Sequence, residues 1–183
     1  MVSISIKRFF VRAKHWQIFL LLIGPCLIAQ LALANSIATP MASVEDFDRT
    51  ARILGAFTLA VMVCLMGWFW SVGSLLTSVI PEQQRLPLLR LRLSLIYPAV
   101  YITYFFATLS VSSPPSALII PFHLLAMFCM FYNLYFISKS LVLAETDKAA
   151  GFYEYSGPFF LIWFFPIGLW IIQPRINRLA ERS

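Results

Sequence analysis

Five stretches of almost uninterrupted apolar residues alternate with short polar segments along the chain. They cover residues 16–34, 53–79, 93–111, 117–143 and 157–173. A helix needs about 20 apolar residues to cross the hydrocarbon core of a bilayer, and the first four stretches reach that length. The pattern therefore predicts an all-α, polytopic helical membrane protein. It has five membrane segments within a single integral membrane domain, residues 1–183.

The fifth stretch is the shortest, and Pro166 and Gly168 interrupt it. Proline removes a helix hydrogen bond and glycine loosens the following turn. The segment therefore either crosses as a kinked helix or enters and returns as a re-entrant segment. Because re-entrant segments are rarer than spans, we expect a kinked crossing helix.

The 14 lysine and arginine residues divide unequally between the two sides that this topology creates. The N-terminal arm and the loops after the second and fourth stretches hold most of them, whereas Arg49 and Arg52 lie in the first external loop. Cytoplasmic loops carry the excess of basic residues, so we expect a cytoplasmic N-terminus. The basic tail, Arg175, Arg178 and Arg182, follows this rule only if the fifth segment returns to the side that it entered.

The N-terminal region also has the outline of a secretory signal peptide. Lys7, Arg8, Arg12 and Lys14 precede the first apolar stretch, and residues 32–34 read Ala-Leu-Ala, as at a cleavage site. The polar leader is long, however, and the apolar run reaches the full spanning length. We therefore favour an uncleaved first helix.

Composition supports the membrane class and leaves no room for a sizeable soluble domain. Hydrophobic residues make up 60% of the 183 residues and charged residues 12%, about half the charged fraction of a soluble domain. The net charge of +6 is explained by the basic flanks of membrane helices, so the lipid bilayer rather than nucleic acid is the expected partner. Cys26, Cys64 and Cys129 lie within apolar stretches and are interpreted as small core residues.

Small residues form a stripe along the second stretch, at intervals of three and four residues that place them on one helix face. The stripe comprises Ala56, Ala60, Cys64, Gly67, Ser71, Ser74 and Ser78. Apolar burial does not drive helices together in lipid, so close backbone approach through small residues does much of that work. The stripe predicts a packing face, either for helices of the same chain or for a homo-oligomeric seam or narrow pore wall.

The third and fourth stretches carry polar side chains that can meet across a helical hairpin. These are Ser94, Tyr97, Tyr101, Tyr104 and Thr108 on the third stretch, and His123 and Asn133 on the fourth. Equal rise along both helices places His123 level with Phe105 and Asn133 level with Leu95. Polar groups in lipid are costly and often functional, so this face is a candidate polar cavity. Alternatively, the tyrosine rings fill the groove left by the small-residue stripe.

No sequence motif for catalysis or nucleotide binding is present: the chain has no Walker loop, no GxSxG and no HExxH. His15 and His123 lie on opposite membrane faces under the predicted topology, so we expect no metal site and no cofactor. Glu45, Asp46 and Asp48 share a side with His123, so a weak external metal or acid–base site is the alternative.

The C-terminal sequence FPIGLWIIQPRIN, residues 165–177, is similar to the end of an uncharacterised family of small bacterial multi-span membrane proteins. The likeness covers less than a tenth of the chain. It implies a location in the bacterial inner membrane and no established activity.

These observations predict a non-enzymatic integral membrane protein that packs with itself or within a larger membrane complex. The alternative is a small channel or transporter that uses the face with Tyr97, Tyr101, Tyr104, His123 and Asn133. A lipid-modifying membrane enzyme is the third and least favoured interpretation.

Overall fold

The computed structural model describes residues 2–38, 44–108 and 119–182, and these segments contain helices and loops without a β-strand. The predicted all-α class is therefore confirmed for the described residues. The elements are α1 (Val2–Arg12), α2 (His15–Ala38), α3 (Val44–Val79), the short 3-10 helix η1 (Glu82–Gln84), α4 (Leu88–Thr108), α5 (Ile119–Thr146), α6 (Phe152–Trp163) and α7 (Phe165–Arg182).

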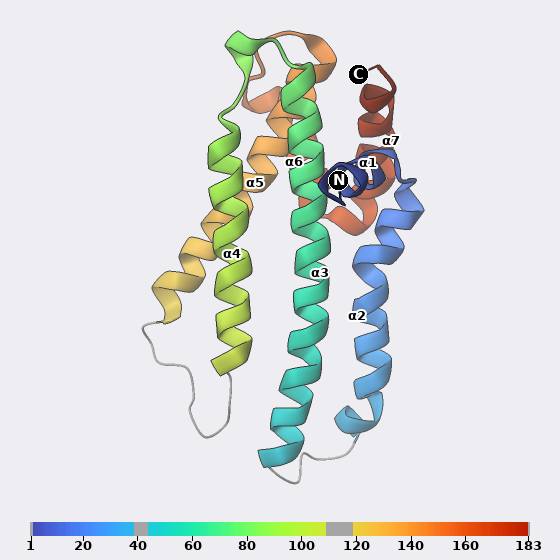
Figure 1. The fold of residues 1–183 in the computed structure, drawn as a ribbon, viewed down its shortest axis with the longest axis vertical. Coiled ribbons are helices and arrows are strands. Elements are labelled where there is room, and N and C mark those ends of the chain that lie inside the picture. The colour runs from blue at the N-terminus through green and yellow to red at the C-terminus, as the bar shows by residue number, and fades with distance from the viewer. Residues whose placement is uncertain (1, 39–43, 109–118, 183) are drawn as a thin grey trace.

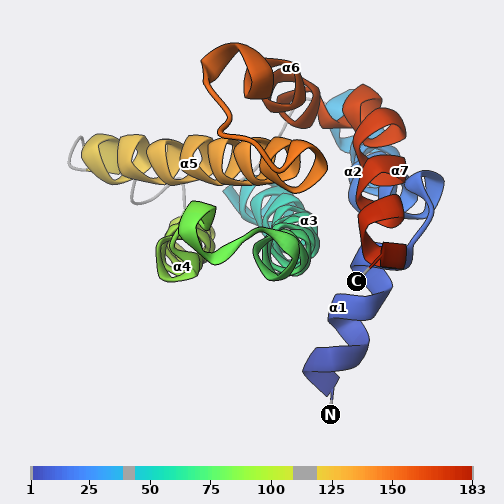
Figure 2. The ribbon, with the colours of Figure 1, turned by 90° about the horizontal axis from the view of Figure 1, so that it is seen from above.

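Helices α2, α3, α4 and α5 run up and down along the long axis of the molecule (Figure 1). Helix α5 is tilted against its neighbours. Helix α1 lies across the upper half of α3, and the view from above shows that it projects away from the bundle (Figure 2). Helix α6 lies on the outer side of α5, and α7 lies beside α2 and α1.

Three helices are long and apolar enough to cross a membrane. They are α3 over residues Asp48–Val79, α4 and α5, with mean hydropathies of 2.0, 1.2 and 1.6 in their apolar windows. Only 22%, 28% and 17% of those windows is buried inside the molecule, so most of their apolar surface faces outward. Such a surface suits lipid contact. The predicted five membrane segments are not confirmed, since the apolar part of α2 covers only His15–Leu31 among the described side chains.

The fifth apolar stretch differs from the single kinked helix that we expected. It forms two helices, α6 and α7, separated at Phe164, whose φ and ψ are −87° and 51°. Pro166 falls in the first turn of α7, where a backbone N–H has no partner within the helix, so proline is well tolerated there. The proline therefore starts a new helix instead of kinking a continuous one.

Both outer ends of the α6–α7 hairpin lie at the same end of the bundle (Figure 1). Helix α6 begins a short loop after α5 ends at Thr146. From α7, Arg175 forms an ion pair with Glu145 in the last turn of α5, and its Nε donates to Glu145 Oε1 at 2.8 Å. Helices α6 and α7 thus form a hairpin whose two outer ends lie beside the last turn of α5.

The main hydrophobic core gathers at this same end. Its largest fully buried side chains include Trp68 and Phe69 of α3, Phe136 of α5 and Ile172 and Ile176 of α7. The opposite half of α3, α4 and α5 is less covered by its own chain. The molecule therefore has one densely packed end and one end made of more loosely covered apolar helices.

Candidate functional site

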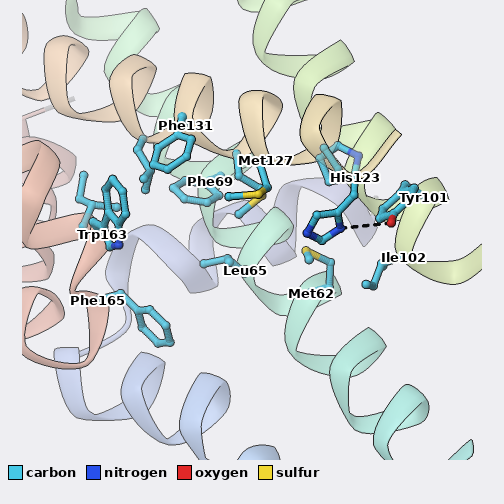
Figure 3. Close-up of a pocket in the computed structure, with 15 residues that line it drawn as sticks. Met62, Leu65, Phe69, Tyr101, Ile102, His123, Met127, Phe131, Trp163 and Phe165 are labelled. Atoms are coloured by element: carbon cyan, nitrogen blue, oxygen red, sulfur yellow. Dashed lines mark hydrogen bonds between the residues drawn. The ribbon is translucent and has the colours of Figure 1, made fainter. Parts of the chain in front are cut away.

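An apolar cavity of about 390 Å³ lies between α3, α4, α5 and the turn that joins α6 to α7 (Figure 3). Thioethers and aromatic rings dominate its wall, among them Met62, Phe69, Met127, Phe131 and Trp163. Unbranched methionine side chains adapt to ligands of irregular shape. A concave apolar wall with few polar groups is the usual form of a small-molecule site.

One polar pair lines this cavity, close to the start of α5. The hydroxyl of Tyr101 and Nδ1 of His123 are 3.1 Å apart, and both side chains contribute to the wall (Figure 3). When the tyrosine hydroxyl donates to Nδ1, the imidazole carries its hydrogen on Nε2. The pair then presents one ring N–H as a donor beside an otherwise apolar space.

The other predicted polar side chains of α4 do not share this cavity. The hydroxyl of Tyr97 donates to the carbonyl of Phe122 at 3.1 Å, which ties α4 to the first turn of α5. Tyr104 is 63% exposed, and the hydroxyl of Thr108 donates to the Tyr104 carbonyl at 2.9 Å. Tyr97 and Tyr104 line, together with Tyr101, a separate cavity of about 310 Å³ between α4 and the first turn of α5.

Asn133 is fully buried between α4 and α5 and bonds to Ser94. The serine hydroxyl donates to Asn133 Oδ1 at 2.5 Å, and Asn133 Nδ2 donates to the Ser94 carbonyl at 3.2 Å. Both ends of the amide are therefore bonded within the hairpin. This pair clamps two helices together and does not line the apolar cavity.

The upper half of the small-residue stripe is covered by the chain itself. A Cβ placed on Gly67 would lie 2.9 Å from the ring of Phe10 on α1, so the glycine allows α1 to rest against α3. Ser71 is 1% exposed, and its hydroxyl donates to the Gly67 carbonyl at 2.6 Å. Ser74 and Ser71 also face the basic side chains of α1 across a second cavity.

The lower half of the stripe is not covered. Ala56 and Ala60 are exposed and Cys64 is half-buried, while Ser78, at the far upper end, is exposed as well. The structure thus divides the predicted stripe at about Gly67. One part serves the fold of this chain, and the other part remains on the surface.

Gln173 of α7 is a polar centre that our sequence reasoning missed. Its side chain is fully buried; Oε1 accepts from the indole N–H of Trp68 at 2.9 Å, and Nε2 donates to the carbonyls of Phe10 at 2.9 Å and Ala13 at 3.1 Å. Asn177 Nδ2 donates to the same Ala13 carbonyl at 3.2 Å. The Phe10 carbonyl lies in the last turn of α1 and the Ala13 carbonyl directly follows that helix, where backbone oxygens lack helical partners.

This centre left a signal in the sequence. Gln173 and Asn177 stand one helical turn apart at the end of an apolar stretch, inside the segment that carries the family resemblance. The pair joins α7 to α1 and α3, and its amide groups cap the C-terminal end of α1.

The described residues contain no group of three or more histidine, cysteine, aspartate or glutamate side chains able to hold a metal ion. Comparison of the chain with protein-family models, with curated proteins and with solved structures finds no match. The functional conclusion therefore depends on the geometry of the membrane helices.

Proposed function

We propose that this chain is a non-enzymatic integral membrane protein that assembles with a second copy of itself in the bilayer. The observation that supports the proposal is the uncovered lower half of the stripe, with Ala56 and Ala60 exposed beside the half-buried Cys64. Small side chains on an outward helix face allow another helix to approach closely, which is the main source of helix association in lipid.

The neighbouring residues favour this face over an ordinary lipid contact. Gly55, one position away, already packs against Phe106 of α4, so small residues on α3 are used for close contact inside the chain as well. Large apolar side chains border the face, including Val63 at 68% exposure and Leu54 at 42%. A second copy would find a shallow groove at Ala56 and Ala60 between these larger neighbours.

The proposed topology has four crossings, α2 to α5, followed by the re-entrant α6–α7 hairpin. Both termini then lie on one side, and all lysines and arginines except Arg49 and Arg52 lie there too. The basic excess assigns that side to the cytoplasm. Together with the resemblance of the C-terminal segment, this orientation supports a multi-pass protein of the bacterial inner membrane.

Cys64 offers a direct test, since a two-fold axis along the membrane normal brings identical residues of a seam together. We expect mild oxidation in native membranes to yield a disulfide-linked dimer, and the Cys64→Ala variant, which keeps a small residue there, to lose it. Cys129→Ala is the matched control, because Cys129 lies on α5. An equal dimer yield from wild type and Cys64→Ala would refute the seam.

A second candidate function rests on the apolar cavity with its Tyr101–His123 pair. It suits an apolar molecule that carries one hydrogen-bonding group, taken up sideways from the membrane. This refines the alternative of a small transporter: the buried Ser94–Asn133 pair is bonded within the hairpin and leaves Tyr101 and His123 as the polar contact.

Filling the cavity tests the second candidate. Met127→Trp places an indole in the wall, whereas Phe128→Trp changes the adjacent residue, which is 67% exposed and does not line the cavity. With Nile red as the apolar probe, we expect Met127→Trp to abolish saturable binding and Phe128→Trp to preserve it. Saturable binding that survives Met127→Trp in a folded protein would place the probe elsewhere.

A further inference from the structure

A second cavity, of about 340 Å³, lies where α1 crosses α3, and its lining is basic. Lys7, Arg8 and Arg12 of α1 contribute three cations, and Ser71 and Ser74 of α3 contribute hydroxyls. No acidic residue belongs to its lining. The carboxylate of Glu181 shares a separate cavity with Arg12.

The cations are held in place by the way α1 is attached. Phe10 packs on Gly67, and the Gln173 amide caps the last turn of the helix at the carbonyls of Phe10 and Ala13. Arg8 and Arg12 are one turn apart and therefore project from the same face of α1. A fixed helix that carries converging cations is prepared to bind an anion without ordering a loop.

Ser74 adds a polar atom that needs a partner. Its Oγ is buried and, among the described residues, has no hydrogen-bond partner. A buried hydroxyl without a partner is unfavourable, by about 1–3 kcal/mol. Ser74 belongs to the cavity lining, so a rotation of its side chain toward the cavity would let the hydroxyl donate to a ligand oxygen and remove the deficit.

An apolar groove of about 390 Å³ begins beside the basic cavity and runs between α3 and α4. Its lining includes Met66, Trp70 and Ile96. Trp70 connects the two spaces: the ammonium of Lys7 lies 4.9 Å from the centroid of its ring, and the guanidinium of Arg92 lies 4.8 Å from it. A charged surface therefore lies next to an apolar one, as the head-group layer lies next to the hydrocarbon layer at a membrane interface.

We infer that this region binds one anionic glycerophospholipid, with its phosphate among Lys7, Arg8, Arg12 and Ser74 and an acyl chain in the groove along Trp70. The cations supply the attraction, as basic pockets between membrane helices do for anionic head groups. The groove favours a lipid over a free phosphate ion, because a phosphate ion has no apolar part to place in it. The site is independent of the proposed self-assembly, because it uses the covered half of the stripe.

Bromine on an acyl chain quenches a tryptophan that it touches, so Trp70 reports occupancy of the groove. The protein is reconstituted in phosphatidylcholine vesicles that contain brominated phosphatidylglycerol, or brominated phosphatidylcholine as the neutral arm. The Trp70→Phe variant supplies the signal of the other tryptophans, which is subtracted. We expect stronger quenching by phosphatidylglycerol, and equal quenching by the two lipids in wild type would overturn the inference.

Charge-matched variants separate the site from general attraction. Arg8→Gln with Arg12→Gln is expected to reduce the preference for phosphatidylglycerol, roughly fivefold for each arginine lost. Lys148→Gln with Arg178→Gln removes the same charge at exposed positions outside the cavity lining and is expected to keep the preference. Equal loss in both pairs would show surface electrostatics alone and overturn the site.

Two further arms complete the test. Ser74→Ala, which preserves the size of the side chain and the packing of α3, is expected to weaken the preference, and an unchanged preference together with unaffected arginine variants would exclude the cavity. Inorganic phosphate at millimolar concentration is expected to leave the quenching unchanged. If it displaces the brominated lipid, the site belongs to a free phosphate ion and the lipid assignment is wrong.

Discussion

Gln173 joins three helices through one side chain, because its amide has both an acceptor for Trp68 and donors for two carbonyls at the C-terminal end of α1. Its position one turn before Asn177 puts both amides against the same helix end.

By contrast, Asn133 and His123 were anticipated as polar partners of the preceding helix. Equal rise along the hairpin brings Asn133 beside Ser94, close to the predicted level of Leu95. His123 meets Tyr101, one turn from the predicted level, because α5 is tilted against α4 (Figure 1).

Replacing Gln173 by leucine should destabilise the fold strongly. The change keeps the volume but leaves the Trp68 N–H and the Phe10 carbonyl without their partner, at about 1–3 kcal/mol for each buried group. We therefore expect the free energy of unfolding to fall by about 3 kcal/mol, measured by thermal melting in detergent. Gln83→Leu, at an exposed position of η1, serves as the control and should change little. Equal melting of the two variants would contradict the role of the amide.

The α6–α7 hairpin depends on a close approach between its two helices. A Cβ on Gly168 would lie 1.6 Å from the carbonyl oxygen of Leu161, so only glycine fits at this crossing. Apolar character and the proline indicate an irregular segment, and the rarity of re-entrant segments alone favoured the kinked crossing helix over a returning hairpin. The choice depends on contacts made after the return, such as the ion pair between Arg175 and Glu145.

Gly168→Ala should therefore open the hairpin. Forcing the Leu161 backbone away costs about 3 kcal/mol or more, judged from overpacked interiors. Gly157→Ala in α6 is the matched control, because a Cβ there meets no atom within 4 Å apart from those of its chain neighbours. We expect the melting temperature in detergent to fall for Gly168→Ala alone. A Gly168→Ala protein as stable as Gly157→Ala would argue against the close approach of α6 and α7.

For the whole molecule, the hairpin sets, under the proposed topology, the side of the bilayer on which the chain ends. A returning α7 puts the C-terminus on the side of α1, which Figure 1 shows at one end of the bundle. The basic tail then follows the rule that governs the rest of the chain. The same arrangement concentrates the packed core at this end and leaves most of the apolar surface of α3, α4 and α5 facing outward.

Reporter fusions test this arrangement in cells. Alkaline phosphatase is active only outside the cytoplasm and green fluorescent protein fluoresces only when it folds inside. We expect C-terminal fusions after Ser183 to fluoresce and to lack phosphatase activity, while a fusion within residues 39–43 does the reverse. A phosphatase-active C-terminal fusion would show that the fifth segment crosses, as the kinked-helix prediction had it.

The amino-acid sequence by itself determined that the chain is helical and that α3, α4 and α5 can cross a membrane, because hydropathy is summed over neighbours in the chain. It also determined the stripe on α3 and the polar faces of the α4–α5 hairpin, because helical periodicity assigns residues to faces. Only the tertiary structure decided that α1 covers Gly67 and leaves Ala60 exposed, that the fifth stretch returns, and that Gln173 closes the end of α1. These outcomes depend on contacts between residues far apart in the chain, about which local patterns carry no information.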